Sequence, residues 1–161
     1  AELFAEFGYP HEAAESLLAK LLKVPMDIKT AKQVIALKYF ATGSLADDET
    51  AKLIEGGARG MSTFMSYFIL KAIAETSGAE IAIDIMKEYY GAMLDRGATS
   101  FFEDFDMDWL PGSGRIDEMP KAGEKDLHGD YGAYCYAGFR HSFCHGWSAG
   151  VIMFIKEYCD R

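Results

Sequence analysis

The sequence has few features that would tie it to nucleic acid, to membranes or to a disulfide-bonded scaffold. Its 161 residues include 16 Lys and Arg against 25 Asp and Glu, which gives a net charge of −9. This balance argues against nucleic-acid and anionic-membrane partners, because both require clustered cations. No uninterrupted apolar run approaches the ~18 residues of a membrane span, and no signal peptide is recognisable. A neutral partner such as a sugar is compatible with this charge.

Cysteine is also scarce, with only Cys135, Cys144 and Cys159. An odd number in a chain of this length is not a disulfide framework, which leaves open one bridge or three free thiols. Apolar residues, by contrast, make up 50% of the chain and aromatic residues 14%. This content is enough to bury a core. The aromatic surplus is typical both of a packed core and of a groove for a ring-shaped ligand.

The first 95 residues have the apolar spacing and the end signals of successive α-helices. Pro10 starts the first helix and Pro25 ends it. Asp27 or Thr30 can cap the second helix, which Gly43 closes. Three more helices are predicted: one that Gly56 and Gly57 stop, one from about Ser62 to Thr76, and one from Gly78 to Arg96. Short links favour antiparallel hairpins, so we expect an all-α fold with helix over more than half of the chain.

The helix predicted over Ser62–Thr76 is the most apolar of these. Tyr67 and Leu70 lie off its main apolar face, so this helix should be buried on more than one side. The face itself is predicted to consist of Phe64, Met65, Phe68, Ile69, Ala72 and Ile73.

Residues 97–140 show no sustained helical or strand period. The stretch is rich in glycine, acidic residues and aromatic residues, and a loop of ~40 residues in a compact domain is usually functional or disordered. Its aromatic content favours an ordered loop. Ser142 can then cap a last helix. The sequence therefore predicts helices to about residue 95, a loop over 97–140 and a final helix over 142–158.

The first candidate site is the segment 97–106, Gly-Ala-Thr-Ser-Phe-Phe-Glu-Asp-Phe-Asp. Glu103 stands among aromatic residues just after a predicted helix end. Aromatic neighbours desolvate a carboxylate, which suits it to proton transfer. A solvated acidic turn is the simpler alternative. A calcium site of Asp104, Asp106 and Asp108 is another, although the spacing and the glycine of an EF-hand are missing.

The second candidate site is the segment 141–150, His-Ser-Phe-Cys-His-Gly-Trp-Ser-Ala-Gly. His141 and His145 would share one face of a helix and could bind zinc with Cys144, but no second pair of ligands follows. A histidine in the core or in a helix cap is the simpler alternative. Residues 146–150 read Gly-x-Ser-x-Gly only formally, because the nucleophile elbow of a serine hydrolase needs a preceding strand.

Taken together, the two segments resemble motifs of bacterial α-L-rhamnosidases. Residues 97–103 resemble the Gly-Ala-Thr-Thr-x-Trp-Glu signature of that family, and residues 89–95 resemble the segment that leads into it. Residues 141–147 resemble its later Ser-x-x-His motif. The resemblance is good from about Gly60 to Gly150 and weaker before that, where only helical hairpins match.

The resemblance implies a fold and a mechanism. The family's catalytic domain is an (α/α)6 toroid of six helical hairpins, so residues 1–161 would form its C-terminal portion. The family inverts configuration with two carboxylic acids. Glu103 is implied to be the general base, and the general acid would belong to a part of the parent protein outside this chain. No metal or organic cofactor is required.

The resemblance also implies which residues bind the sugar. His145 matches the histidine that contacts the sugar in the family, and Phe102 stands where many members have Trp, which preserves a stacking surface of a different size. The remaining candidates near the sugar are Asp104, His141 and Trp147.

The implied activity is hydrolysis of terminal rhamnose from glycosides or polysaccharides. We expect the chain alone to be inactive, and we expect a half-barrel with exposed helix faces to self-associate or to bind its remainder tightly. Two alternatives stay open. One is another sugar specificity on the same barrel, and the other is a non-catalytic helical module that binds carbohydrate or serves as a scaffold.

Overall fold

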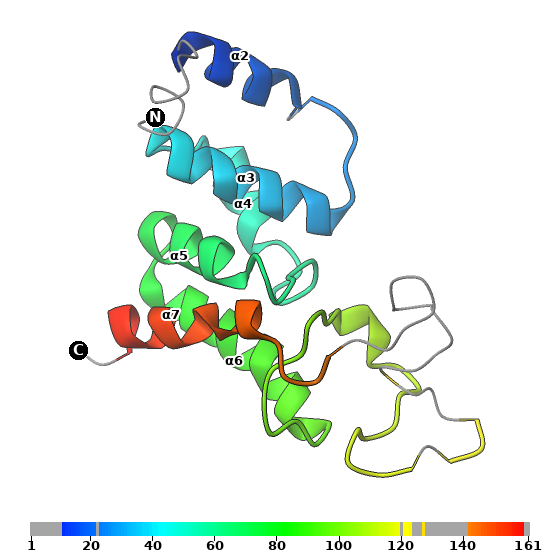
Figure 1. Ribbon diagram of the computed structural model, residues 1–161. Helices are drawn as coiled ribbons and strands as arrows, with labels where there is room; N and C mark the ends of the chain where they lie inside the picture. Colours follow the sequence, from blue (N-terminus) through cyan, green and yellow to red (C-terminus); the bar gives the residue numbers. More distant parts are fainter. Residues whose placement is uncertain (1–10, 22, 120, 124–126, 128–141, 160–161) are drawn as a thin grey trace.

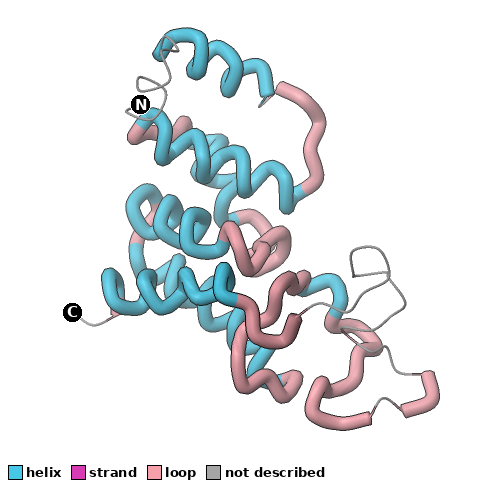
Figure 2. Tube along the Cα trace, viewed as in Figure 1, coloured by secondary structure: helices cyan, strands magenta, loops and turns pink. Residues whose placement is uncertain are grey.

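The chain folds into a stack of helices, seen in a computed structural model (Figure 1). The structure describes residues 11–21, 23–119, 121–123, 127 and 142–159. These residues form helices, turns and loops and contain no strand (Figure 2). The prediction of an all-α fold is therefore confirmed over the described residues.

Six α-helices and two 3-10 helices are described. The 3-10 helices are η1 (Met107–Trp109) and η3 (Gly146–Ala149). The α-helices are α2 (His11–Leu21), α3 (Ile28–Thr42), α4 (Asp47–Ile54), α5 (Ser66–Thr76), α6 (Ala79–Asp95) and α7 (Gly150–Tyr158).

From α3 onward the helices alternate between two layers. Helices α3, α5 and α7 lie side by side in one layer, with α5 between the other two, and α4 and α6 lie behind them (Figure 1). Helices α3, α5 and α7 also run in the same direction in this view. The amino-terminal ends of these three helices consequently lie at the same end of the layer.

Helix α3 has the predicted ends. The Asp27 carboxylate accepts a hydrogen bond of 2.8 Å from the backbone N–H of Thr30, which satisfies one of the donors left unpaired at a helix start. Gly43 ends the helix with a left-handed backbone at φ 74°, and its N–H donates to the carbonyl of Tyr39. Both predicted end signals are confirmed.

Helix α5 begins later than predicted, at Ser66 instead of Ser62. Residues 63–65 form a turn, and the side chains of Ser62 and Thr63 make hydrogen bonds there. The Ser62 hydroxyl accepts from the N–H of Met65, and the Thr63 hydroxyl donates to the carbonyl of Glu103. The start of the helix is therefore displaced by contacts with the loop, which no local pattern encodes.

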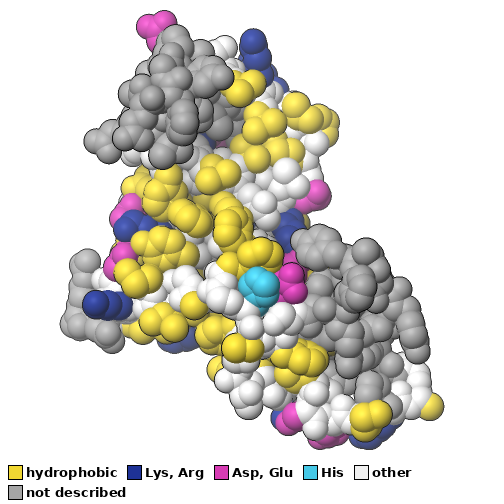
Figure 3. Space-filling view, in the orientation of Figure 1, with side chains coloured by type: hydrophobic (Ala, Val, Ile, Leu, Met, Phe, Trp, Pro, Cys, Tyr) yellow, Lys and Arg dark blue, Asp and Glu magenta, His cyan; other side chains and the backbone are white. Residues whose placement is uncertain are grey.

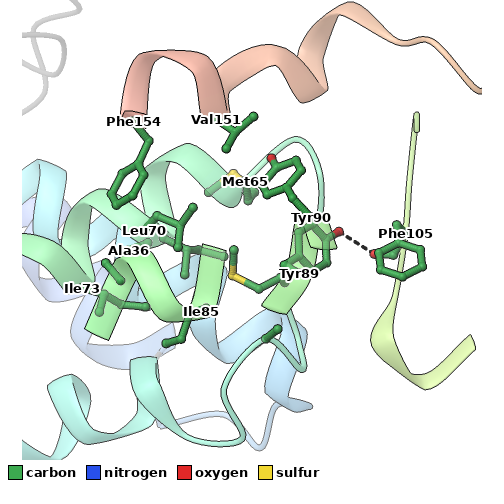
Figure 4. Packing of buried hydrophobic residues seen from close by; sticks show 14 of the residues in the cluster. Ala36, Met65, Leu70, Ile73, Ile85, Tyr89, Tyr90, Phe105, Val151 and Phe154 are labelled. Carbon is green, nitrogen blue, oxygen red and sulfur yellow. Dashed lines mark hydrogen bonds between the residues drawn. The ribbon is translucent and has the colours of Figure 1, made fainter. Parts of the chain in front are cut away.

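The core lies around α5. Ile69 and Ile73 on the predicted apolar face are fully buried, and so is Leu70 outside that face. The prediction that this helix is buried on more than one side is confirmed (Figure 4). Phe64 was predicted to be on the inward face, but it is 53% exposed because it precedes the helix instead of belonging to it.

No described helix is both long and apolar enough to cross a membrane.

Candidate functional site

The two segments singled out in the sequence lie against each other. The N–H of Glu103 donates to the carbonyl of Ser142 at 2.8 Å, and the N–H of His145 donates to the carbonyl of Phe101 at 3.1 Å. The structure therefore brings Glu103 and His145 together at one place.

This pairing explains why the last helix starts later than predicted. Residues 142–145 are not helical, η3 follows them, and α7 begins at Gly150 instead of Ser142. The carbonyl of Ser142, which would accept the first bond of a helix starting there, accepts instead from the N–H of Glu103 in the loop. The predicted final helix over 142–158 is thus wrong in its first turn, is a 3-10 helix over 146–149, and has the predicted end.

The Glu103 carboxylate is held through one of its two oxygens. Oε2 accepts a hydrogen bond of 3.0 Å from the N–H of Ser142. The same oxygen lies 3.9 Å from Nδ1 of His145, which is close enough for charge attraction when the imidazole is protonated but too long for a hydrogen bond. The side chain of Glu103 is 20% exposed. Among the described residues, both contacts of the carboxylate use Oε2.

The backbone of Glu103 is fixed as well. Its carbonyl oxygen accepts hydrogen bonds from the Thr63 hydroxyl and, at 2.6 Å, from Nε1 of Trp147. These donors come from the segment before α5 and from η3. Two separate parts of the chain, the segment before α5 and residues 142–147, therefore hold Glu103 in one orientation, as pre-organised chemistry requires.

Glu103 lines a pocket of about 270 Å³. The pocket lies where the amino-terminal ends of α3, α5 and α7 meet the loop. Its lining residues are Lys29, Gln33, Ser62, Thr63, Phe64, Met65, Glu103, Asp104 and Trp147.

Aromatic rings form part of the pocket wall. Phe64 and Trp147 meet edge to face, with ring centroids 5.6 Å apart, and they are 53% and 41% exposed. The imidazole of His145 lies 4.2 Å from the Trp147 ring. Figure 3 shows a histidine beside an acidic side chain at the lower end of a band of hydrophobic side chains. Exposed aromatic faces beside a carboxylate are suited to the apolar face of a sugar ring.

The acidic residues after Glu103 turn toward cations. Asp104 lies 3.3 Å from the ammonium of Lys29, and Asp108 forms a bidentate pair with Arg59 at 2.8 and 2.9 Å. The described residues contain no group of three or more His, Cys, Asp or Glu side chains that could hold a metal ion. Asp104 and Asp106 face Lys29 while Asp108 pairs with Arg59, so the calcium alternative has no support in the described part.

Phe102 is a correction to the predicted site. Its side chain is fully buried in the hydrophobic core and does not line the pocket. It packs near Phe105 and Phe143, with ring centroids 6.1 and 5.9 Å away. Phe102 thus packs inward while its neighbour Glu103 lines the pocket. Phe64 lines the pocket instead.

The other residues considered in the sequence are the three cysteines, His141 and Ser148. His141 and Cys135 lie outside the described residues, and Cys144 and Cys159 are free and exposed thiols. Ser148 is buried, and its hydroxyl donates to the carbonyl of His145, so it supports the turn.

Two buried tyrosines of α6 anchor the loop and α5. The hydroxyl of Tyr89 donates to the carbonyl of Phe105 at 2.6 Å (Figure 4), and that of Tyr90 lies 2.6 Å from the hydroxyl of Ser66. Burial raises the pKa of Tyr89 well above 10.0 and that of Tyr90 to about 12. Both phenols are therefore neutral hydrogen-bonding groups over the physiological pH range.

Six pocket residues were not predicted from the sequence: Lys29, Gln33, Ser62, Thr63, Phe64 and Met65. They belong to α3 and to the segment before α5, which only the tertiary fold brings close to Glu103. One signal was available for Lys29, which lies in the first turn of α3. A cation is unfavourable at that end of a helix unless an anion compensates it, and here Asp104 does.

Comparison with known proteins gives no relative for this chain. No protein-family model matches it, and neither does any curated protein or any solved structure.

Proposed function

We propose that the chain is part of a glycoside hydrolase that resembles an inverting α-L-rhamnosidase and removes terminal rhamnose from glycosides or polysaccharides. We further propose that its helices are the C-terminal portion of an (α/α)6 toroid. The alternation from α3 to α7 supports the toroid, since each second helix returns to the same layer with the same direction.

The observation that carries the proposal is the position of the Glu103 carboxylate. It lies in the same pocket as the exposed rings of Phe64 and Trp147, and a second motif residue, Ser142, fixes one of its oxygens. A fixed carboxylate beside stacking surfaces suits hydrolysis of a sugar acetal.

In this mechanism Glu103 is the general base. Its carboxylate takes a proton from water as that water attacks the anomeric carbon, while a general acid protonates the leaving oxygen from the opposite side. Asp104 is not assigned as the general acid, because it lies beside the Lys29 ammonium. The acid is therefore assigned to another part of the proposed parent domain, and we expect the 161-residue chain alone not to turn over substrate.

The test uses the complete gene product that carries this chain. It is assayed against a panel of aryl glycosides that includes the α-L-rhamnoside, and proton NMR follows which anomer appears first. We expect cleavage of the rhamnoside with β-L-rhamnose as the first product, as inversion requires. Retention of configuration would contradict the assignment of Glu103 as a base.

Other outcomes separate the alternatives. Cleavage of a different aryl glycoside would keep the glycosidase and overturn the rhamnose specificity. Binding of sugar without any cleavage would favour the non-catalytic carbohydrate-binding module.

A further inference from the structure

The pocket contains a pair of opposite charges that the proposed mechanism does not use. The Lys29 ammonium lies 3.4 and 3.3 Å from the two carboxylate oxygens of Asp104 and 4.0 Å from the carboxylate of Asp106. Lys29 belongs to α3 and Asp104 to the loop, so the two side chains join two walls of the pocket.

The distances leave this pair able to bind a ligand. An ammonium group has three donors, and its charge-assisted bonds to carboxylates are usually 2.7–2.9 Å long. The contacts to Asp104 are longer than this range, and the two side chains remain 30% and 23% exposed. Lys29 can therefore donate to a ligand, and Asp104 can accept from it.

A donor and an acceptor side by side match two adjacent hydroxyl groups of a sugar. One hydroxyl oxygen can accept from Lys29 while its neighbour donates to Asp104, and both bonds are charge-assisted. Gln33 lies one turn after Lys29 on α3 and lines the same pocket, which adds a further polar group.

The charge of the pocket further restricts the ligand. Lys29 is compensated by Asp104, and Glu103 then leaves an excess of negative charge. Carboxylated or phosphorylated sugars would meet repulsion there. The exposed rings of Phe64 and Trp147 favour a ligand with an apolar face.

From these contacts we propose that Lys29 and Asp104 are specificity-determining residues that bind two adjacent hydroxyls of a neutral sugar, whose apolar face lies on Phe64 and Trp147. This inference rests on the proposed function, because it assigns the substrate class of the same pocket. It also assigns a role to α3, which lies outside the part of the chain that carries the motif resemblance.

The test measures, by titration calorimetry, how tightly the complete gene product and its variants bind a series of sugars. The ligands are methyl α-L-rhamnoside and its analogues that lack one ring hydroxyl each, and the variants are Lys29→Met and Asp104→Asn. Lys87→Met on the exposed face of α6 is the matched control. Thermal melts of each variant establish that it is folded, and Lys29→Gln replaces Lys29→Met if the latter does not fold.

We expect Lys29→Met to weaken binding of the rhamnoside about 10-fold or more, while Lys87→Met leaves it unchanged. Lys29→Met should not weaken binding of the analogue that lacks the hydroxyl bound by Lys29, because the partner hydroxyl is already missing. Asp104→Asn should show the same coupling with the adjacent hydroxyl.

Two results overturn the inference in distinguishable ways. If the wild type binds the rhamnoside and Lys29→Met binds it equally well, the inference is wrong and the proposed function stands. If the wild type binds an anionic sugar in preference to the rhamnoside, both the substrate class and the proposed specificity are wrong.

Discussion

The carboxylate of Glu103 accepts a hydrogen bond of 3.0 Å from the backbone N–H of Ser142, which lies 39 residues further along the chain. This contact joins the loop that carries Glu103 to the segment before η3 and α7. The geometry of the pocket consequently depends on how α7 packs on the rest of the fold.

The packing of α7 on α5 should be sensitive to a methyl group at Gly150. A Cβ at this position would lie 2.9 Å from Cβ of Tyr67, which is too close for two carbon atoms. Because that atom is near the backbone of α5, relief requires a shift of a helix. We expect Gly150→Ala to lower the free energy of unfolding by about 1–3 kcal/mol in urea denaturation.

Gly146→Ala is the matched control for this substitution. Gly146 lies four residues earlier, and a Cβ there meets no atom within 4 Å. We expect its stability to equal that of the wild type or to exceed it slightly, because Ala loses less backbone entropy than Gly. Equal effects of the two substitutions would contradict the close approach of α7 to Tyr67.

Lys32 should make stability depend on alkaline pH. It is fully buried in α3 and donates a 2.6 Å hydrogen bond to the carbonyl of Gly57. Burial lowers the pKa of its ammonium from 10.5 to about 8, against the attraction of Glu88 and Glu55. Between these pH values the unfolded chain binds more protons than the folded one, so the free energy of unfolding should rise with pH.

Comparison with Lys32→Met isolates this effect from other groups that titrate at alkaline pH. The stability of the wild type relative to the variant should increase from pH 8 to pH 10.5, by roughly 3 kcal/mol at most. Urea denaturation of both proteins across this range is the measurement. If the two curves of stability against pH run parallel, the burial of a charged Lys32 is contradicted.

Asp27 should make stability depend on acidic pH. The N–H of Thr30 holds the pKa of the Asp27 carboxyl below its ordinary value of 3.8. Since the folded-state pKa is depressed, the contribution of the cap is complete above pH 3.8 and is lost as pH falls through the lower folded-state value. Asp27→Ala should cost about 1 kcal/mol at neutral pH.

Asp27→Asn separates capping from titration. The amide keeps an oxygen that can accept from Thr30, but it has no proton to gain in acid. We expect this variant to match the wild type closely at neutral pH and to be the more stable of the two in acid. Circular dichroism during denaturation at both pH values would show this change in relative stability, and a constant difference would rule out the charged cap.

A helix end could be predicted from the sequence where the residues that determine it lie within one turn of that end. The ends of α3 depend on Asp27 and Gly43, which act within one turn, and both were predicted. The starts of α5 and α7 depend on bonds to the distant loop, through Thr63 and Ser142, and both were predicted too early.

The candidate site shows the same division. Glu103 and His145 could be selected as candidates from the sequence because each belongs to a contiguous motif, and the structure brings the two side chains within 3.9 Å. The inward orientation of Phe102 depends on tertiary packing, and so do the positions of Lys29 and Phe64 in the pocket. These contacts have no periodic or motif signal and could not be predicted from the sequence.

The most direct test of the proposed function is the hydrolysis rate of an aryl α-L-rhamnoside by the complete gene product with Glu103→Gln. Glu118→Gln, an exposed acid outside the pocket, is the control. The account predicts that Glu103→Gln lowers kcat by ~10²-fold or more without a change in thermal stability, while Glu118→Gln has no effect. A Glu103→Gln variant that keeps the wild-type rate would contradict the account.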